Sequence, residues 1–176
     1  ATIIASVAAQ GVGADGSIEP DLTFRVEEFV AADTRPLLGY LFFDEGRSAF
    51  PNRYPQSGPT AVELFDPEKV DRDDPLAVQY RSLDIIGHRM TENDGARLTI
   101  VGTNDGQGEA LPISAARAAE AKRYLVDRWK IDPDRITTSA RGLPATPSNQ
   151  TVTDGVAENR RVEFASNDRN ILAPVR

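Results

Sequence analysis

The sequence has no cysteine among its 176 residues and only one histidine. Without cysteine the chain can form neither disulfide bonds nor thiolate metal sites, and these residues offer no cysteine for an N-terminal lipid. His88 stands alone in a predicted helix, so a zinc site or a histidine-activated nucleophile lacks its partners. Asp71, Asp73 and Asp74 resemble a calcium ladder, but the glycine and terminal glutamate of an EF-hand loop are missing. We expect no catalytic residues, no metal and no cofactor.

Long apolar runs and an excess of basic residues are missing as well. The longest apolar stretch, residues 36–43, is far shorter than the ~20 residues of a membrane-spanning helix. Lysine and arginine number 20 against 27 aspartates and glutamates, which gives a net charge of −7. Nucleic-acid partners normally require a basic face. We therefore expect no membrane span and no nucleic-acid partner, whereas a small zwitterionic or cationic ligand remains compatible with the charge.

The length and composition of the sequence indicate a globular chain with one ordinary domain and an extension. Hydrophobic residues make up 40% and charged residues 27%, which is enough to bury a core. The chain begins with Ala1 and shows no signal-peptide pattern in its first residues. We expect Ala1 to result from processing or from a chosen boundary, which leaves room for a targeting signal upstream.

Residues 1–35 have the pattern of β-structure. The segment 2–9 is apolar and partly β-branched, and residues 11–16 supply glycine and aspartate for a turn. The segment 22–30 alternates apolar and polar residues, as a half-exposed strand does. We predict a strand-rich N-terminal extension over residues 1–35, attached to a larger parent protein.

From residue 36 onward, strands and helices alternate. Residues 36–43 predict a buried central strand, and the proline-rich segment 47–75 predicts a long irregular connection. A helix over 75–93, with Asp74 as its N-cap, carries an apolar stripe of Leu76, Tyr80, Leu83, Ile86 and Met90.

The second half predicts a strand at 97–101, a glycine-rich loop, and a helix from Ser114 to about Lys130. A strand at 135–140, a loop over 142–155 and a last strand at 159–165 follow, and we expect the tail 167–176 to fray. Alternation of this kind predicts an α/β (α+β) sandwich, in which helices pack on one face of a mixed sheet.

Arg117 and Asp105 are the candidate binding residues. If Ser114 is the N-cap, Arg117 lies in the first helical turn, where a cation opposes the helix dipole at a cost of about 0.3–1 kcal/mol. A ligand carboxylate would offset that cost, and Asp105 would accept from an ammonium group. The alternative is that Asp105 is a turn residue and Arg117 pairs with a neighbouring acid such as Glu109.

Motifs in the same region resemble those of a known family. A strand ends near Gly-x-x-Asp, a helix opens with Ile-Ser-x-x-Arg-Ala, and a later strand contains Asn-Arg-Arg-Val-Glu. In combination these motifs resemble the OmpA-like C-terminal domain, over about residues 37–166. The matching residues are Gly102, Asp105, Ile113, Ser114, Arg117, Ala118, Gly142, Pro144, Asn149, Asn159, Arg160, Arg161, Val162 and Glu163, with Phe43, Asp44 and Ser48 upstream.

The resemblance implies a domain over residues 36–166 with a mixed four-stranded sheet of βαβαβ-β type. It implies non-catalytic binding of peptidoglycan through the diaminopimelate-bearing stem peptide, which would anchor an outer-membrane or periplasmic assembly to the cell wall. The implied location is the periplasm or cell envelope, where other envelope proteins are possible partners. Asp105 and Arg117 match the residues that grip the ammonium and carboxylate groups. The assisting residues are expected to be Asn104, Asp44, Asn159 and Arg160.

Three departures from the family pattern motivate an alternative function. Asn104 precedes Asp105 where the family has threonine, the loop before the helix is short, and Ala110 replaces an asparagine. Loss of the asparagine removes a possible hydrogen bond worth about 0.5–1.5 kcal/mol. The alternative is a structural or protein-interaction module of the same fold with weak or lost peptidoglycan binding, in which an exposed edge strand within residues 1–35 pairs with a partner.

Overall fold

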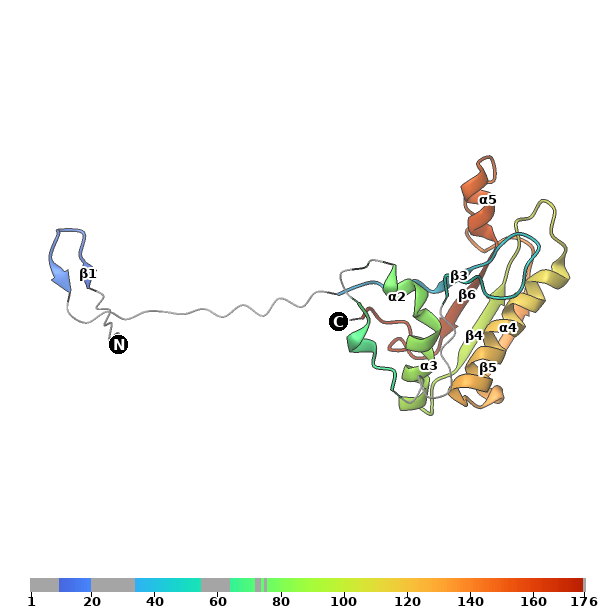
Figure 1. The fold of residues 1–176 in the computed structure, drawn as a ribbon, viewed down its shortest axis with the longest axis horizontal. Helices are drawn as coiled ribbons and strands as arrows, with labels where there is room; N and C mark the ends of the chain where they lie inside the picture. The colour runs from blue at the N-terminus through green and yellow to red at the C-terminus, as the bar shows by residue number, and fades with distance from the viewer. Residues whose placement is uncertain (1–9, 20–33, 55–63, 72–73, 75, 176) are drawn as a thin grey trace, which may run out of the picture. The chain divides into compact units, whose positions relative to one another are not determined.

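The computed structural model describes residues 10–19, 34–54, 64–71, 74 and 76–175 (Figure 1). The chain divides into two compact units, residues 1–32 and 33–176. In the first unit, β1 (Gly11–Val12) pairs with β2 (Ile18–Glu19) as an antiparallel hairpin. The Asp15 carboxylate accepts from the Ser17 backbone N–H in the turn. The predicted turn is confirmed, and the strands predicted at 2–9 and 22–30 lie outside the described residues.

A mixed four-stranded sheet forms the centre of the second unit, as predicted. Its strand order is β3-β6-β4-β5, in which β4 and β5 are parallel and β6 is antiparallel to both β4 and β3. The strand predicted at 36–43 is shorter than expected and lies at the edge of the sheet, because only β6 pairs with it. The strands are β3 (Tyr40–Phe42), β4 (Leu98–Gly102), β5 (Ile136–Ala140) and β6 (Arg161–Ser166).

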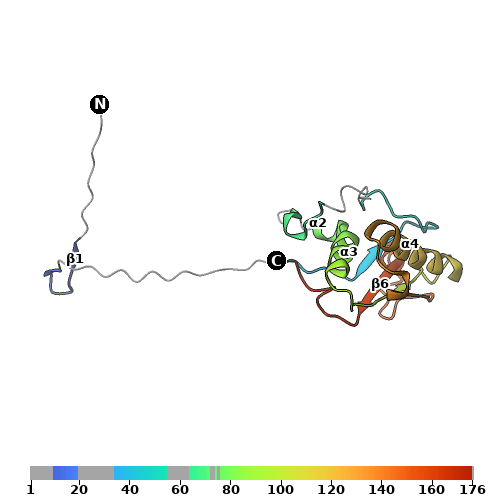
Figure 2. The ribbon, with the colours of Figure 1, turned by 90° about the horizontal axis from the view of Figure 1, so that it is seen from below.

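The long helices α3 and α4 lie side by side against the sheet (Figures 1 and 2). The helix predicted at 75–93 is two helices, which the non-helical backbone of Arg81 separates. Asp74 accepts from the Leu76 N–H, but the N-cap of α2 is Leu76, so the predicted N-cap at Asp74 is wrong. The helices and 3₁₀ turns are η1 (Pro67–Lys69), α2 (Ala77–Tyr80), α3 (Ser82–Glu92), α4 (Leu111–Trp129), η2 (Pro133–Arg135) and α5 (Thr153–Asn159).

The predicted start of α4 at Ser114 is wrong. The helix begins at Leu111, and the N-cap is Ala110, which makes no side-chain capping bond. Pro112 fits the first turn, because a proline there gives up no helical hydrogen bond. Ser114 is buried inside the helix, and Arg117 lies in its second turn. The dipole cost assigned to Arg117 therefore does not apply, since it is confined to the first turn.

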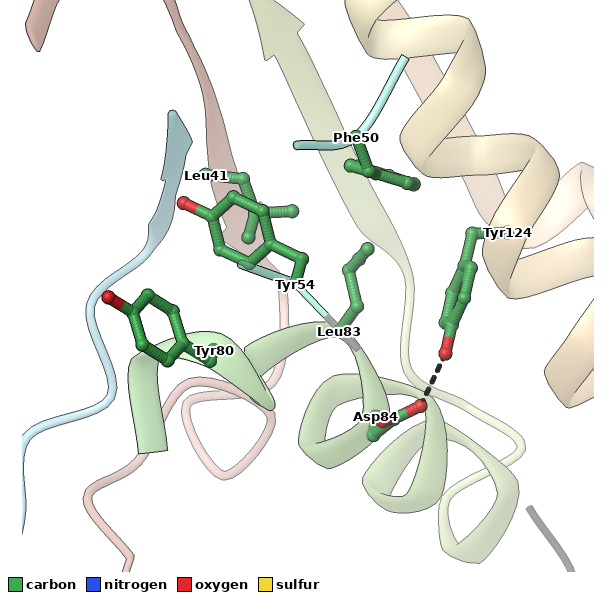
Figure 3. A pocket seen from close by; sticks show the side chains of 7 residues that line it. All are labelled: Leu41, Phe50, Tyr54, Tyr80, Leu83, Asp84 and Tyr124. Atoms are coloured by element: carbon green, nitrogen blue, oxygen red, sulfur yellow. Dashed lines mark hydrogen bonds between the residues drawn. The ribbon is translucent and has the colours of Figure 1, made fainter. Parts of the chain in front are cut away.

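The core lies between the sheet and the two long helices. Fully buried side chains come from α3, α4 and the sheet strands, including Ile86, Leu125 and Ile100. Tyr124 of α4 donates to the buried Asp84 of α3 at 2.7 Å, which ties the two helices together beside an aromatic cluster (Figure 3). The void there, about 10 Å³, is no larger than a water molecule requires.

The C-terminal segment packs onto the domain, so the prediction that it frays is wrong. Ile171 and Val175 are buried, and Val175 forms a β-bridge with Arg35. Arg89 of α3 donates to three carbonyl groups of the segment, those of Ile171, Ala173 and Pro174. Within the described residues, no helix is both long and apolar enough to cross a membrane.

Candidate functional site

The candidate site is built where the loop 103–110 leaves β4 and enters α4. Gly102, the last residue of β4, is in close contact with the helix: a Cβ atom there would lie 1.8 Å from the Ser114 carbonyl oxygen. Thr103 then donates its N–H to the Arg161 carbonyl, and Asn104 donates to that of Gly142. The missing side chain of Gly102 thus brings α4 onto the end of the sheet and fixes where the loop starts.

Asn104 and Asp105 hold the loop in shape. Asn104 accepts from the Gly106 N–H at 2.9 Å and donates to the Glu109 carbonyl at 3.1 Å. One oxygen of Asp105, Oδ1, accepts from the backbone N–H groups of Gln107, Gly108 and Glu109. The Asn104 amide therefore makes hydrogen bonds within the loop and helps to hold it in shape.

Asp105 lines a surface depression with a carboxyl group that is almost fully buried. Its second oxygen, Oδ2, lies 3.5 Å from Arg160 Nη1. Burial of the Asp105 carboxyl acts to raise its pKa, but the three backbone donors and the Arg160 charge outweigh burial, so the pKa lies below its usual value. Asp105 thus presents a negative charge whose Oδ2 faces Arg160.

Arg117 has all five of its N–H donors in use. Nε donates to the Arg47 carbonyl, while Nη1 and Nη2 also donate to the carbonyls of Thr103 and Asp44. The remaining two N–H groups form a bidentate pair with Glu109, each at 2.6 Å. The side chain is 0% exposed. The pairing with Glu109, which the sequence left open as the alternative, is the one observed, and Arg117 keeps no free donor for a ligand carboxylate.

Glu109 joins three segments of the chain. Besides the pair with Arg117, its Oε1 accepts from the Gly46 N–H at 2.8 Å, and its side chain is only 6% exposed. Gly46 belongs to the turn after β3, whereas Glu109 precedes α4. This single carboxylate therefore fastens the turn after β3 to the loop 103–110 and to α4.

Two neighbouring depressions open beside the loop. They lie at the end of the sheet where Figure 1 shows α5. Glu45 and Arg160 line both, and Asp105 lines the larger one of about 590 Å³. The smaller one measures about 390 Å³. The other residues of the larger depression are Gln107, Gly108, Gln150, Thr151, Val152, Thr153 and Val156, and those of the smaller are Phe42, Phe43, Asp44, Arg53, Ala157 and Glu158.

The helix α5, which sequence reasoning missed, shapes this end of the molecule. It begins within the segment 142–155 that was predicted to be a loop and ends at Asn159, so Asn159 and Arg160 do not belong to the last strand as predicted. Asn159 is fully buried and exchanges hydrogen bonds with the Ser148 backbone. Gly155 makes this helix hard to recognise from the sequence, because glycine is a weak helix former. A Cβ atom at this position would lie 2.0 Å from the Asn149 carbonyl oxygen.

The remaining candidates divide between surface and interior. The Asp44 carboxylate is exposed, pairs with Arg53 at 3.0 Å and lines the smaller depression. Arg161 pairs with Glu163 at 2.9 Å. The structure therefore brings Asp105, Arg160 and Asp44 to the depressions, and it places Asn104, Arg117 and Asn159 in the supporting interior.

Comparisons with known proteins support the resemblance seen in the sequence. No family model matches the chain. Outer membrane protein A of Bordetella avium is 41% identical over 86 residues, which cover 47% of this chain and 43% of that protein. Peptidoglycan-binding protein ArfA of Mycobacterium bovis is 32% identical over 95 residues, which cover 52% of this chain and 29% of that protein. The matches span less than half the length of either relative.

A solved structure resembles the fold. The peptidoglycan-associated lipoprotein of Burkholderia pseudomallei has a TM-score of 0.50 and 13% identity, and the match covers 73% of this chain and 89% of that one. This likeness supports the α/β fold with its mixed four-stranded sheet, and the sequence relatives, which match about half of this chain, agree with the OmpA-like resemblance.

Proposed function

We propose that the OmpA-like domain binds peptidoglycan without catalysing a reaction. The observation that carries the proposal is the larger depression, in which Asp105 Oδ2 and Arg160 Nη1 lie 3.5 Å apart. One anion and one cation at that distance match the ammonium and carboxylate groups of a zwitterionic amino-acid end. The relative named a peptidoglycan-binding protein supports the same assignment.

The ligand in this proposal is the diaminopimelate-type stem peptide of the cell wall. Its terminal ammonium group binds Asp105, whose other oxygen is already fixed by the loop, and its carboxylate binds Arg160. Asp44 and Glu45 extend the acidic rim for further donors of the peptide. Asn104, Asn159 and Arg117 contribute by holding the loop and the end of α5 in place.

The cellular role in this proposal is anchoring. A domain that holds the stem peptide fastens an outer-membrane or periplasmic assembly to the wall, and the relative named outer membrane protein A supports an envelope location. Other envelope proteins are then the further partners, attached through the rest of the parent chain.

Co-sedimentation with purified peptidoglycan sacculi tests the proposal. Arg160→Ala should lower the apparent affinity by about tenfold or more, because a charge-assisted contact to the ligand carboxylate is lost. Arg123→Ala is the matched control, since Arg123 also pairs with an acid but lies exposed on α4. Unchanged folding is checked by circular dichroism. Equal sedimentation of wild type and Arg160→Ala would contradict the assignment of this site.

A second candidate function is a structural or interaction module that has lost wall binding. The full use of all five Arg117 donors favours it, because the guanidinium group expected to hold a carboxylate is already occupied. Absence of wild-type protein from the sacculus pellet would favour this function over peptidoglycan binding.

A further inference from the structure

The carboxylate of Glu109 lies where the sequence led us to expect a ligand carboxylate. Both of its oxygens lie 2.6 Å from Arg117 nitrogens, and Oε1 also accepts from the Gly46 N–H at 2.8 Å. A guanidinium fork combined with a backbone donor is the usual way in which a protein holds a bound carboxylate. Here the chain itself supplies the carboxylate.

The loop delivers this carboxylate in a fixed position. The Glu109 carbonyl accepts from the Asn104 amide, and the Glu109 N–H donates to Asp105 Oδ1. Both backbone groups of Glu109 are thus tied to the two residues that shape the loop. The Glu109 side chain therefore reaches the Arg117 guanidinium group from the loop and covers it. Arg117 belongs to the lining of neither depression.

We propose that Glu109 is a built-in substitute for a ligand carboxylate and thereby determines which ligands the site accepts. The inference rests on the proposed function, which it deepens. With Glu109 in place, Arg160 is the position in the larger depression that takes a carboxylate, and Arg117 with Gly46 forms a second position that is already filled. Removal of the Glu109 carboxylate frees two N–H groups of Arg117 and one of Gly46 for an external carboxylate.

The first test is chemical rescue of Glu109→Ala by small molecules. Acetate should raise the thermal midpoint of Glu109→Ala by at least about 3 °C more than that of wild type, because it binds only the native state at the vacated position. Acetamide, which has the same shape without the charge, should not. Glu120→Ala is the matched control, because Glu120 also pairs with an arginine at 2.6 Å, on the exposed part of α4.

The inference would be overturned if acetate raised the thermal midpoints of Glu109→Ala, Glu120→Ala and wild type by the same amount. If Glu109→Ala does not fold unaided, the same comparison is made on refolding from denaturant, in which acetate should restore the native spectrum and acetamide should not. This readout uses no peptidoglycan, so its failure leaves the sacculus result for wild type intact.

The second test uses a diaminopimelate-type stem peptide and isothermal titration. Glu109→Gln removes the charge at nearly constant size, so the peptide carboxylate displaces it more easily, and Glu109→Ala vacates the position. Both variants should bind the peptide more tightly than wild type, with a gain of about tenfold or more for Glu109→Ala. Unchanged or weaker binding by both, with wild type still binding, would overturn the role of Glu109 and leave the proposed function standing.

Discussion

At the scale of single residues, the site is defined by which charges are already paired. Arg117 looked available in the sequence because Ser114 seemed to begin the helix three residues before it. The helix begins at Leu111 instead, and the acid that neutralises Arg117 is Glu109, at the end of the preceding loop. Helix starts are hard to place when a proline fits the first turn as well as a serine fits the cap. The pairing of Arg117 with Glu109 was therefore available from the sequence as an alternative, whereas the start of the helix was not.

The lowered pKa of Asp105 predicts a pH-dependent stability. A carboxyl whose pKa falls on folding stabilises the native state fully above its unfolded pKa, and the effect is lost as the pH falls through the folded value. Asp105→Asn should therefore be less stable than wild type at pH 7, and the gap should shrink once the pH drops below the ordinary value of 3.8. Urea unfolding of both proteins at pH 7, 5, 4 and 3 measures this difference in the free energy of unfolding.

The control for this pH series is Asp127→Asn, on the exposed side of α4. Its unfolding free energy should follow that of wild type much more closely across the series. A difference between wild type and Asp105→Asn that stays constant from pH 7 to pH 3 would show that the Asp105 charge does not contribute to stability.

At the scale of elements, the contact between β4 and α4 positions the loop that carries the site. Gly102→Ala should destabilise the domain by about 3 kcal/mol, because the new methyl group would lie 1.8 Å from the backbone oxygen of Ser114 and the helix would have to shift. Gly108→Ala is the matched control, since a Cβ atom there meets nothing within 4 Å. Its effect should stay within about 0.5 kcal/mol. Similar unfolding free energies for the two variants would contradict the close contact.

Sequence patterns predicted those elements whose burial follows a regular period. β4 alternates more and less buried residues, and α4 buries one stripe, so both were placed within a few residues. α3 buries the predicted Leu83, Ile86 and Met90, although most of its first half is buried as well. The seven-residue α5 has too few turns for such a stripe and contains a glycine. The edge position of β3 depends on which strand pairs with it, and its Leu41 lies beside side chains from α2, α3 and α4 (Figure 3). The hydrophobic pattern within a strand does not show which other strand will pair with it.

At the scale of the whole molecule, the compact second unit extends beyond the segment predicted as the domain. The predicted domain ended at residue 166, because the tail 167–176 lacks any helical or strand period. The tail is held by isolated apolar anchors and by backbone carbonyl groups that accept from Arg89, neither of which requires a repeating pattern. The compact second unit therefore includes residues 167–175, of which Ile171 and Val175 belong to its core.

Removal of the tail should destabilise this unit even though the candidate site is untouched. A chain that ends at residue 166 loses Ile171, which is 1% exposed, together with Val175 and the three acceptors of Arg89. Burial of each side chain contributes roughly 1.5–3 kcal/mol to stability, so Ile171→Ala alone should cost about 2–4 kcal/mol and the truncation more.

Leu64→Ala, at a leucine that is 79% exposed, is the control and should cost little stability. A truncated chain that unfolds at the same denaturant concentration as the full chain would mean that the tail does not contribute to the core. Because the larger depression lies against α5, and none of its lining residues belongs to the tail, sacculus binding by the folded fraction should persist.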